Sequence, residues 1–238
     1  MKDLPIKQNY NVSTNVDEPT KLAVVQMHNS LFIKIAGIES LMDNMDTKTQ
    51  KFLALDLELN KPSGKIIQVG VAIGKLGDKH EQYITKKWYI DPGESIDAFI
   101  TELTGITDHD IRANCVSHQT VADELSALIK EHNCFVNPIT WGGNDASELL
   151  AEFCKHHVNF PHFGHRWFDV KTWYALMMLA KNKNPTGGLA SAMGYYKLQF
   201  KGDAHRADVD ARNTLVLFFH LIERQRKMDY LIEDAKAL

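Results

Sequence analysis

Two carboxylates stand two residues apart in an otherwise apolar segment: Asp56 and Glu58 within Phe52–Leu59. If this segment is a β-strand, both side chains point to the same face of the sheet. Carboxylates on one apolar face repel each other and lose hydration unless a cation lies between them. On the pair alone, a solvated edge strand is the better explanation, because Asp-x-Glu is a common tripeptide. Whether the pair is a cation site or part of a solvated edge strand therefore depends on whether other acids in the chain accompany it.

A second group of chemically active residues begins the last periodic segment. The sequence from His205 to Asp210 fits His-x-Ala-x-x-Asp, a short pattern that also arises by chance. His205 could accept a proton near neutral pH, and Asp210 would add a third carboxylate. The alternative is a helix N-terminus whose acids favour the helix dipole, which is the role we expect for Asp208.

A fourth acid, Asp145, ends the segment Trp141–Asp145, where a predicted strand runs into a predicted helix. Ligands of α/β sheets usually bind at the carboxyl ends of strands. Taken alone, Asp145 would be explained as a helix N-cap. Taken with the other groups, it completes a set of four carboxylates and one histidine.

The composition is that of a globular protein long enough for one sizeable domain, or for one domain with an appendage. The chain has 238 residues, of which 44% are hydrophobic and 24% charged. A formal net charge of −3 argues against a protein that coats long nucleic acid by bulk electrostatics. An enzyme that binds a few phosphates at one strand end is still compatible with this charge, because bound cations supply positive charge locally.

Cellular location is indicated by what the sequence lacks. It has no run of eighteen apolar residues that could span a membrane, and its first nineteen residues have no apolar core of a secretory signal. The three cysteines, Cys115, Cys134 and Cys154, show no close pairing, which favours reduced thiols. We therefore expect a cytoplasmic protein without a membrane partner.

The elements that must position the acids follow from the apolar patterns. Phe52–Leu59, Lys65–Ile73 and Tyr83–Ile90 read as strands joined by short turns, which predicts an antiparallel meander. Strands and helices then alternate. The predicted segments are a helix at Val121–Ile129, a strand at Cys134–Trp141, a helix at Ala146–Phe153, a strand at Arg166–Val170, a helix at Trp173–Ala180 and a final long helix carrying Leu215, Phe218 and Ile222. This order predicts an α/β sandwich around a mixed sheet.

An additional amphipathic helix is predicted ahead of this domain, from Pro19 to Met45. Its apolar residues recur at spacings of three and four. They are Val24, Met27, Leu31, Ile35, Ile38, Met42 and Met45. We expect residues 1–48 to form a tail with this helix and residues 49–238 to form the main domain. The helix would bury its stripe on its own domain or, as we favour, in a homodimer.

The order of the acids resembles the DEDDh 3′→5′ exonucleases of the ribonuclease H-like fold, a group with polymerase proofreading subunits, ribonuclease T and oligoribonuclease. The resemblance covers roughly residues 50–225 and extends to secondary motifs. These are Ile66–Gly70, Tyr89–Gly93, Leu103–Ile106 and Phe168–Val170. One departure is Asn144, where many relatives have an aromatic residue, and it concerns the shape of the nucleotide pocket.

The resemblance implies a fold, a reaction and a set of roles. The fold would be a ribonuclease H-like mixed sheet, with three antiparallel strands followed by parallel strands, flanked by helices and preceded by a helical extension. The reaction would be hydrolysis from the 3′ end of single-stranded RNA or DNA by two Mg²⁺ or Mn²⁺ ions, releasing nucleoside 5′-monophosphates. The implied metal ligands are Asp56, Glu58, Asp145 and Asp210, the general base is His205, and the substrate contacts are Leu57, Leu103, Thr104 and His205.

Several alternatives stay open at this level. Cys154, His157, His162 and His165 have spacings compatible with zinc, although a polar helix end and loop explains them too. Aromatic side chains could stack on bases but fit core packing better; these are Trp141, Phe168 and Trp173. Three cations could contact phosphates or lie on a solvated surface: Lys171, Lys201 and Arg206. The chain could also be a polymerase-associated proofreading subunit or a non-catalytic nucleic-acid-binding protein of the same fold.

Overall fold

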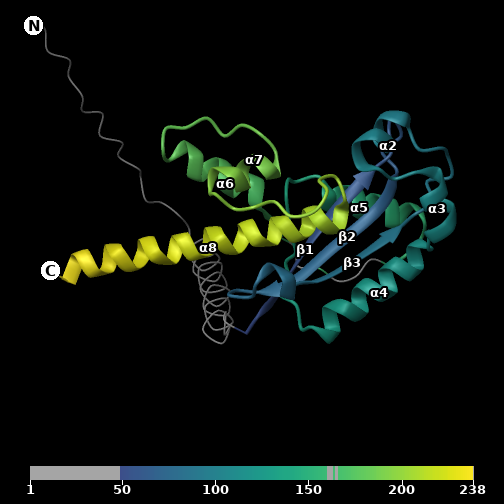
Figure 1. The fold of residues 1–238 in the computed structure, drawn as a ribbon. Helices are drawn as coiled ribbons and strands as arrows, with labels where there is room; N and C mark the ends of the chain where they lie inside the picture. Colours follow the sequence, from purple (N-terminus) through teal and green to yellow (C-terminus); the bar gives the residue numbers. More distant parts are fainter. Residues whose placement is uncertain (1–48, 160–162, 164–165, 238) are drawn as a thin grey trace, which may run out of the picture. The chain divides into compact units, whose positions relative to one another are not determined.

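A computed structural model describes residues 49–159, 163 and 166–237 of the chain (Figure 1). The predicted helix from Pro19 to Met45, the domain boundary at residue 48 and the homodimer lie outside these residues and stay predictions. None of the described helices is long and apolar enough to cross a membrane.

A five-stranded mixed sheet forms the centre of the described region, in the order β3-β2-β1-β4-β5. β1 (Lys51–Leu59), β2 (Ile66–Lys75) and β3 (Ile84–Tyr89) form the predicted antiparallel meander. β4 (Ile139–Thr140) and β5 (Phe168–Asp169) are added in parallel beyond β1. The predicted ribonuclease H-like mixed sheet is therefore confirmed, and the strand that carries the first two acids is its central strand.

The strand predicted at Cys134–Trp141 is much shorter than expected. Only Ile139–Thr140 form β4, and Cys134 makes an isolated bridge to Lys51. The interruption lies at Pro138, which has no N–H to donate to a ladder, although its carbonyl accepts the Phe168 N–H at 2.9 Å. The last predicted strand is shortened as well, because Val170 already belongs to the next helix.

Helices cover both faces of the sheet. The predicted ones are found with small changes of boundary: α4 (His118–Glu131), α5 (Asp145–Lys155), α6 (Val170–Leu179) and α8 (Ala207–Ala237). Four short elements were not predicted: the 3-10 turn η1 (His80–Gln82), α2 (Ala98–Thr104), α3 (Asp108–Asn114) and α7 (Leu189–Tyr195). Each of these is too short for an apolar period to stand out. Side-chain caps mark the start of α2, at Asp97, and of α3, where Thr107 and Asp110 form a capping box.

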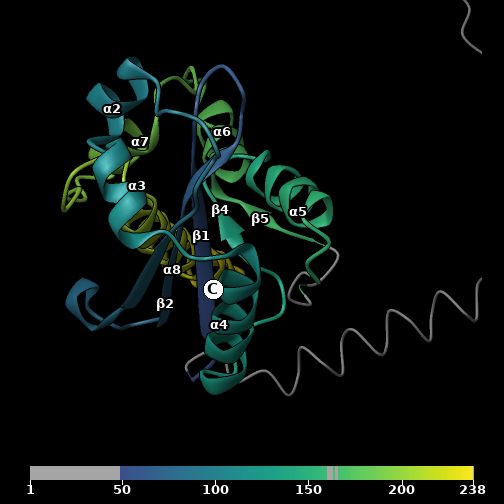
Figure 2. The same ribbon diagram turned by 90° about the vertical axis from the view of Figure 1, so that its right-hand side faces the viewer.

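Alternation along β1 divides the apolar core into two layers. Phe52 and Ala54 face the side covered by α6, α7 and α8, whereas Leu53 and Leu55 face the side covered by α4 and α5 (Figure 2). Asp56 has the parity of Phe52 and Ala54, so it continues their row on the α8 side, as Glu58 does. The acids thus stand where the apolar layer beneath α8 ends.

The N-terminus of α8 lies directly on β2, at Gly70. A Cβ atom at Gly70 would come within 2.1 Å of the Ala207 carbonyl carbon, so only glycine permits this approach. Gln68, on the same face, is fully buried and accepts the Ala207 N–H at 2.8 Å. The register places Gly70 opposite Asp56 and Gln68 opposite Glu58. The residues that dock α8 are therefore the strand partners of the acids.

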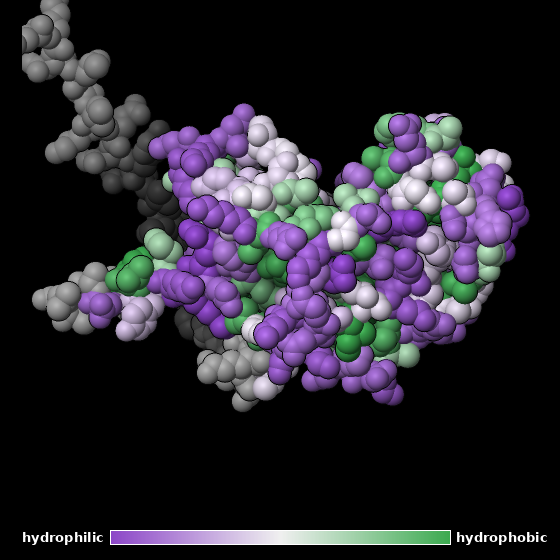
Figure 3. Space-filling model, viewed as in Figure 1, coloured by the Kyte–Doolittle hydropathy of each residue, from purple (hydrophilic) through white to green (hydrophobic). Residues whose placement is uncertain are grey.

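The other end of α8 extends past the sheet (Figure 1). Its last turns expose Met228, Tyr230, Leu231 and Ile232, each at 48% or more. Most of the face drawn in Figure 3 is hydrophilic, and hydrophobic side chains are visible on this projecting end of the helix. Only the N-terminal part of α8 thus takes part in the packing that positions the acids.

We predict that Gly70→Ala destabilises the protein by about 1–3 kcal/mol or more, because the methyl group meets backbone that cannot rotate away. Thermal unfolding of the two proteins measures this loss. Gly194→Ala is the matched control, since a Cβ at this helical glycine meets no atom within 4 Å. It should leave the Tm unchanged or raise it. Equal Tm values for Gly70→Ala and the wild type would contradict the close approach of α8.

Candidate active site

Three carboxylates from two elements converge at one end of the central strand. Asp56 and Glu58 come from β1 and Asp210 from the first turn of α8, and one oxygen of each lies within 4.8 Å of the other two. Glu58 is only 8% exposed, and the other two are partly buried. The structure therefore brings together three of the four predicted metal ligands, and the solvated edge strand considered for Asp56 and Glu58 is excluded.

Asp145 approaches the same space from the start of α5, although it does not join this tight group. Its charge raises the pKa of both Asp56 and Glu58. The N-cap of α5 is Asn144, whose side chain makes no capping bond, so the N-cap explanation of Asp145 is wrong. Asp145 is the first helical residue, and its carboxylate remains available to a ligand.

The loop before Asp145 is held by a residue to which sequence analysis gave no role. Asp169 Oδ1 accepts the Gly142 N–H at 3.0 Å and also the N–H groups of Lys171 and Thr172. One carboxylate thus caps α6 and fixes the turn that leads into α5. The motif Phe168–Val170 was recognised in the sequence, but only the fold shows that its acid supports Asp145.

The pKa values of all four acids are raised, with burial as the largest cause in each case. Burial and the charges of Asp145, Asp210 and Glu58 raise the pKa of Asp56 well above its usual range. Burial, with Asp210 and Asp145, raises the pKa of Glu58 to about 8. The pKa of Asp145 rises to about 7 and that of Asp210 to about 6, again through burial first. Carboxylates gathered in this way lack positive charge, and hard divalent cations supply it through oxygen ligands.

His205 precedes α8, which begins at Ala207 and not at His205 as the sequence suggested. Its backbone has a φ of 63°, in the left-handed region, and its N–H donates to Asp210 Oδ2 at 3.0 Å. This bond and the charge of His205 both lower the pKa of Asp210. The imidazole itself is exposed. The turn therefore holds the predicted general base beside the predicted metal ligand.

Arg206 acts electrostatically on one of the acids, since its charge lowers the pKa of Glu58. Its guanidinium donates to the Tyr89 hydroxyl at 3.3 Å and lies beside Gly105. Of the other predicted phosphate contacts, Lys201 pairs with Glu81, and Lys171 is exposed. Arg206 is thus the only one of the three whose charge is shown to act on an acid of this site.

The predicted substrate contacts fall into different environments. The Leu57 side chain is buried in the core, so only its backbone could meet a substrate. Leu103 is 39% exposed near the end of α2. The Thr104 hydroxyl is buried, donates to the Ile100 carbonyl at 2.8 Å and accepts the Ile106 N–H at 3.0 Å. Thr104 therefore shapes the turn, whereas the Leu103 side chain is open to solvent.

The aromatic candidates divide in the same way. Trp141 packs against Tyr174, and Trp173 packs edge-on against Phe218, as the core interpretation predicts. Phe168 is 38% exposed and lines, with Trp173, a surface hollow of about 340 Å³. Of the zinc candidates, Cys154 and His157 are exposed, and His162 and His165 lie outside the described residues.

A ribonuclease H-like sheet that gathers acids from its central strand and two helix N-termini defines a nuclease fold with an acidic site that could hold metal ions. The chain belongs to the RNase T exonuclease family, whose profile matches residues 53–218 and so includes every predicted catalytic residue. The DEDDh resemblance inferred from the sequence is confirmed.

Known relatives agree with this family. ERI1 exoribonuclease 2 of Danio rerio is 28% identical over 149 residues, which make up 54% of this chain and 26% of that protein. The nuclease domain of 3′hExo, a DEDDh family member bound to rAMP, has a TM-score of 0.62 at 16% identity and covers 76% of this chain and 95% of its own. Exonuclease I of E. coli, solved with a dT13 oligonucleotide, has a TM-score of 0.56 at 18% identity and covers 77% of this chain and 43% of its own. This chain therefore spans about a quarter of the curated relative and less than half of exonuclease I.

We predict that, without metal, the acids destabilise the fold as the pH rises. Their pKa values of about 6 to 8 exceed the unfolded values of about 4, so the stability that they contribute is complete below about pH 4 and is lost progressively as the pH rises from there to about 8. In EDTA, Glu58→Gln should match the wild type near pH 5 and have the higher Tm at pH 8.5. Mn²⁺ should stabilise the wild type more than the variant at the higher pH.

Comparison with the variant removes the contribution of other titrating groups. Burial lowers the pKa of His80, His118 and His220. The stability that these histidines contribute to the protein is therefore lost in the opposite direction, as the pH falls. They are the same in both proteins, so they cancel in the difference. A Tm difference that is constant from pH 5 to 8.5 would show that Glu58 titrates normally.

Proposed function

We propose that this protein is a 3′→5′ exonuclease that hydrolyses phosphodiester bonds at the 3′ end of single-stranded RNA or DNA and releases nucleoside 5′-monophosphates. The observation that carries the proposal is the convergence of Asp56, Glu58 and Asp210. Asp145 is close enough to raise the pKa of Asp56, and the His205 backbone N–H donates to Asp210. The membership of the chain in an exonuclease family supports the same reaction class.

The donor set suits two divalent cations of the Mg²⁺ or Mn²⁺ type. Asp56, Glu58 and Asp210 would hold one, and Asp145 would support the second together with Asp56. Carboxylate oxygens are the ligands that these hard ions prefer, and the raised pKa values show that the acids lack a positive partner. When bound, the cations would polarise the scissile phosphate and neutralise the charge that develops during displacement.

The residues of the chain itself would orient the substrate and move the proton. His205 is exposed beside Asp210 and would accept the proton of the attacking water through its imidazole. Arg206, held by Tyr89, would face the negative charge of the terminal nucleotide. Leu103 and the backbone at Leu57 would pack against the terminal nucleoside. A pocket that closes around one end of a strand explains why cleavage would start from a terminus.

The choice between RNA and DNA depends on contacts with the 2′-hydroxyl. The relative from Danio rerio is named an exoribonuclease, the 3′hExo domain was solved with rAMP, and exonuclease I was solved with a DNA oligonucleotide. We therefore propose single-stranded nucleic acid of either sugar as the substrate class. A proofreading subunit would be distinguished by co-purification of a polymerase, and a non-catalytic binding protein by lack of hydrolysis with metal present.

The first test is directional digestion. With Mg²⁺ or Mn²⁺, a 5′-labelled single strand of RNA or DNA should shorten as a ladder, and EDTA should stop the reaction. A circular single strand of the same sequence should survive, because it offers no end for the pocket to enclose. Rapid cutting of the circle would contradict the exonuclease proposal, and an uncut linear strand would favour the non-catalytic alternative.

The second test separates the roles of the acids and the histidine. Asp56→Asn should lower metal affinity and rate together, because it removes a charge shared by the cations. His205→Ala should keep substrate binding in Ca²⁺ but lose about a hundred- to ten-thousand-fold in rate.

Asp208→Ala is the internal control for this series. Asp208 lies in the first turn of α8, within 3.6 Å of the Lys87 ammonium, and outside the His-x-Ala-x-x-Asp pattern. The variant should therefore stay active. An inactive Asp208→Ala combined with an active Asp210→Ala would show that the wrong acid of α8 has been assigned to the metal.

A further inference from the structure

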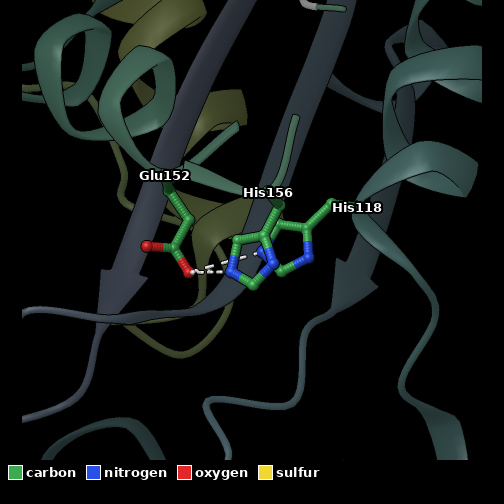
Figure 4. Close-up of side chains that lie close together, drawn as sticks. All are labelled: His118, Glu152 and His156. Atoms are coloured by element: carbon green, nitrogen blue, oxygen red, sulfur yellow. Dashed lines mark hydrogen bonds and ion pairs between the residues drawn. The ribbon is translucent and has the colours of Figure 1, made fainter. Parts of the chain in front are cut away.

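A second group of metal-ligand side chains lies on the helices α4 and α5, on the opposite face of the sheet from α8. His118 is the first residue of α4, Glu152 lies in the last turns of α5, and His156 is the C-cap residue of α5 (Figure 4). The Nε2 atoms of His118 and His156 lie 3.3 and 3.5 Å from the same Glu152 oxygen. All three ligand atoms lie within 4.8 Å of one another.

These separations match the geometry of a tetrahedral metal site. Zinc bonds of about 2.0–2.1 Å to nitrogen and oxygen place neighbouring ligand atoms roughly 3.3–3.4 Å apart. The two histidine–glutamate distances, 3.3 and 3.5 Å, lie at or close to this value. Glu152 and His156 are four residues apart on one face of α5, a spacing at which two helical side chains can share an ion. The third ligand comes from a different helix, so an ion would link α4 to α5.

The present contacts leave both imidazoles competing for one acceptor. The rings are stacked, with centroids 3.8 Å apart and planes inclined by 15°, and both direct Nε2 to Glu152 Oε1 (Figure 4). Two positively charged rings would repel each other strongly at this distance. A cation between the three atoms would satisfy both ring nitrogens and the carboxylate once the rings turn slightly apart. His156 is 43% exposed, which gives an ion access and leaves room for water as a fourth ligand.

We propose that His118, Glu152 and His156 bind one divalent transition-metal ion of the zinc type. Two imidazoles and one carboxylate select such an ion over Mg²⁺, whereas the all-carboxylate site beneath α8 selects the harder ion. The two sites would therefore take different metals. The ligands also differ from the set of cysteine and histidines considered from the sequence, since neither Cys154 nor His157 belongs to the group.

The ion would stabilise the helix that carries an acid of the active site. Asp145 begins α5, and Glu152 follows seven residues later, about 10 Å along the helix axis. A bond from the far end of α5 to α4 would restrict the tilt of α5 and so the position of Asp145. This consequence depends on the proposed nuclease function, but metal binding by the cluster does not.

The test measures zinc binding by the full-length protein. The protein is stripped with a chelator, returned to a large excess of Mg²⁺ to occupy the acidic site, and titrated with Zn²⁺ by calorimetry and with Co²⁺ by visible absorption. We expect one Zn²⁺ per chain that Mg²⁺ does not displace, and a Co²⁺ spectrum typical of nitrogen and oxygen ligands in tetrahedral geometry. No retained zinc in the wild type would overturn the proposal.

Variants assign the ligands. His118→Ala and His156→Ala should each weaken zinc binding by at least about tenfold. His109→Ala, an exposed helical histidine on α3, should bind like the wild type. His156 is the more exposed ligand, so His156→Ala gives the result even if His118→Ala fails to fold. Thermal unfolding should show that zinc raises the Tm of the wild type and of His109→Ala but not of His156→Ala.

Two further variants separate this site from other places where zinc could bind. Loss of the retained ion in Asp210→Asn, with normal binding in His156→Ala, would place it in the acidic site and overturn the proposal. Loss of the retained ion in a Cys154→Ala/His157→Ala variant alone would also overturn the proposal, because it would assign zinc to the cysteine and histidine ligands considered from the sequence. Because every readout is metal binding or unfolding, failure of this proposal is distinct from failure of the nuclease proposal.

Discussion

The site depends on the contact between the backbone of α8 and the face of β2. Gly70 leaves room for the peptide between Ala207 and Asp208, and Gln68 accepts the Ala207 N–H from beneath. Asp210 follows in the same helical turn, so this docking sets its distance from the acids of β1. His205 belongs to the turn that leads into the contact. A shift of α8 by the width of one methyl group would separate Asp210 from Asp56 and Glu58.

This contact holds together charges that would otherwise separate. Burial is the largest cause of the raised pKa for each of the four acids, and repulsion by neighbouring carboxylates adds to it. Among the described residues, compensation comes from Arg206 at Glu58, from the N–H and the charge of His205 at Asp210, and from a backbone hydrogen bond at Asp145. The stability of the apolar core therefore holds the four carboxylates in an arrangement that is unfavourable without cations. Such local cost is expected where a site is shaped for a ligand.

The fourth acid is positioned by a separate mechanism. Asp145 comes from the start of α5, and the loop before it is fixed by Asp169 through the Gly142 N–H. Glu152 and His156, at the other end of α5, contact His118 of α4. The helix is thus constrained at both ends, by a carboxylate of β5 and by a residue of α4. The acids of β1 and α8 need one close backbone contact, whereas Asp145 needs two distant supports.

The sequence determined the class of fold, the order of its main elements and the five candidate residues of the site, because these depend on local patterns. The parity of Asp56 and Glu58 on a strand, the apolar periods of the long helices and the His-x-Ala-x-x-Asp pattern are all visible within a few residues. It did not predict α2, α3 or α7, which are too short to show an apolar period, and it extended β4 past Pro138. Only the tertiary structure decided that Asp145 is no N-cap, that Thr104 is occupied within its own turn, and that Asp169 supports the loop before α5. It also decided that His118 meets Glu152 and His156. His118 lies more than thirty residues before both of them, and no pattern in the sequence connects residues at that separation. Distances, burial and shifts of pKa depend on which faces the folded elements bring together, and that information is absent from the spacing of residues along the chain.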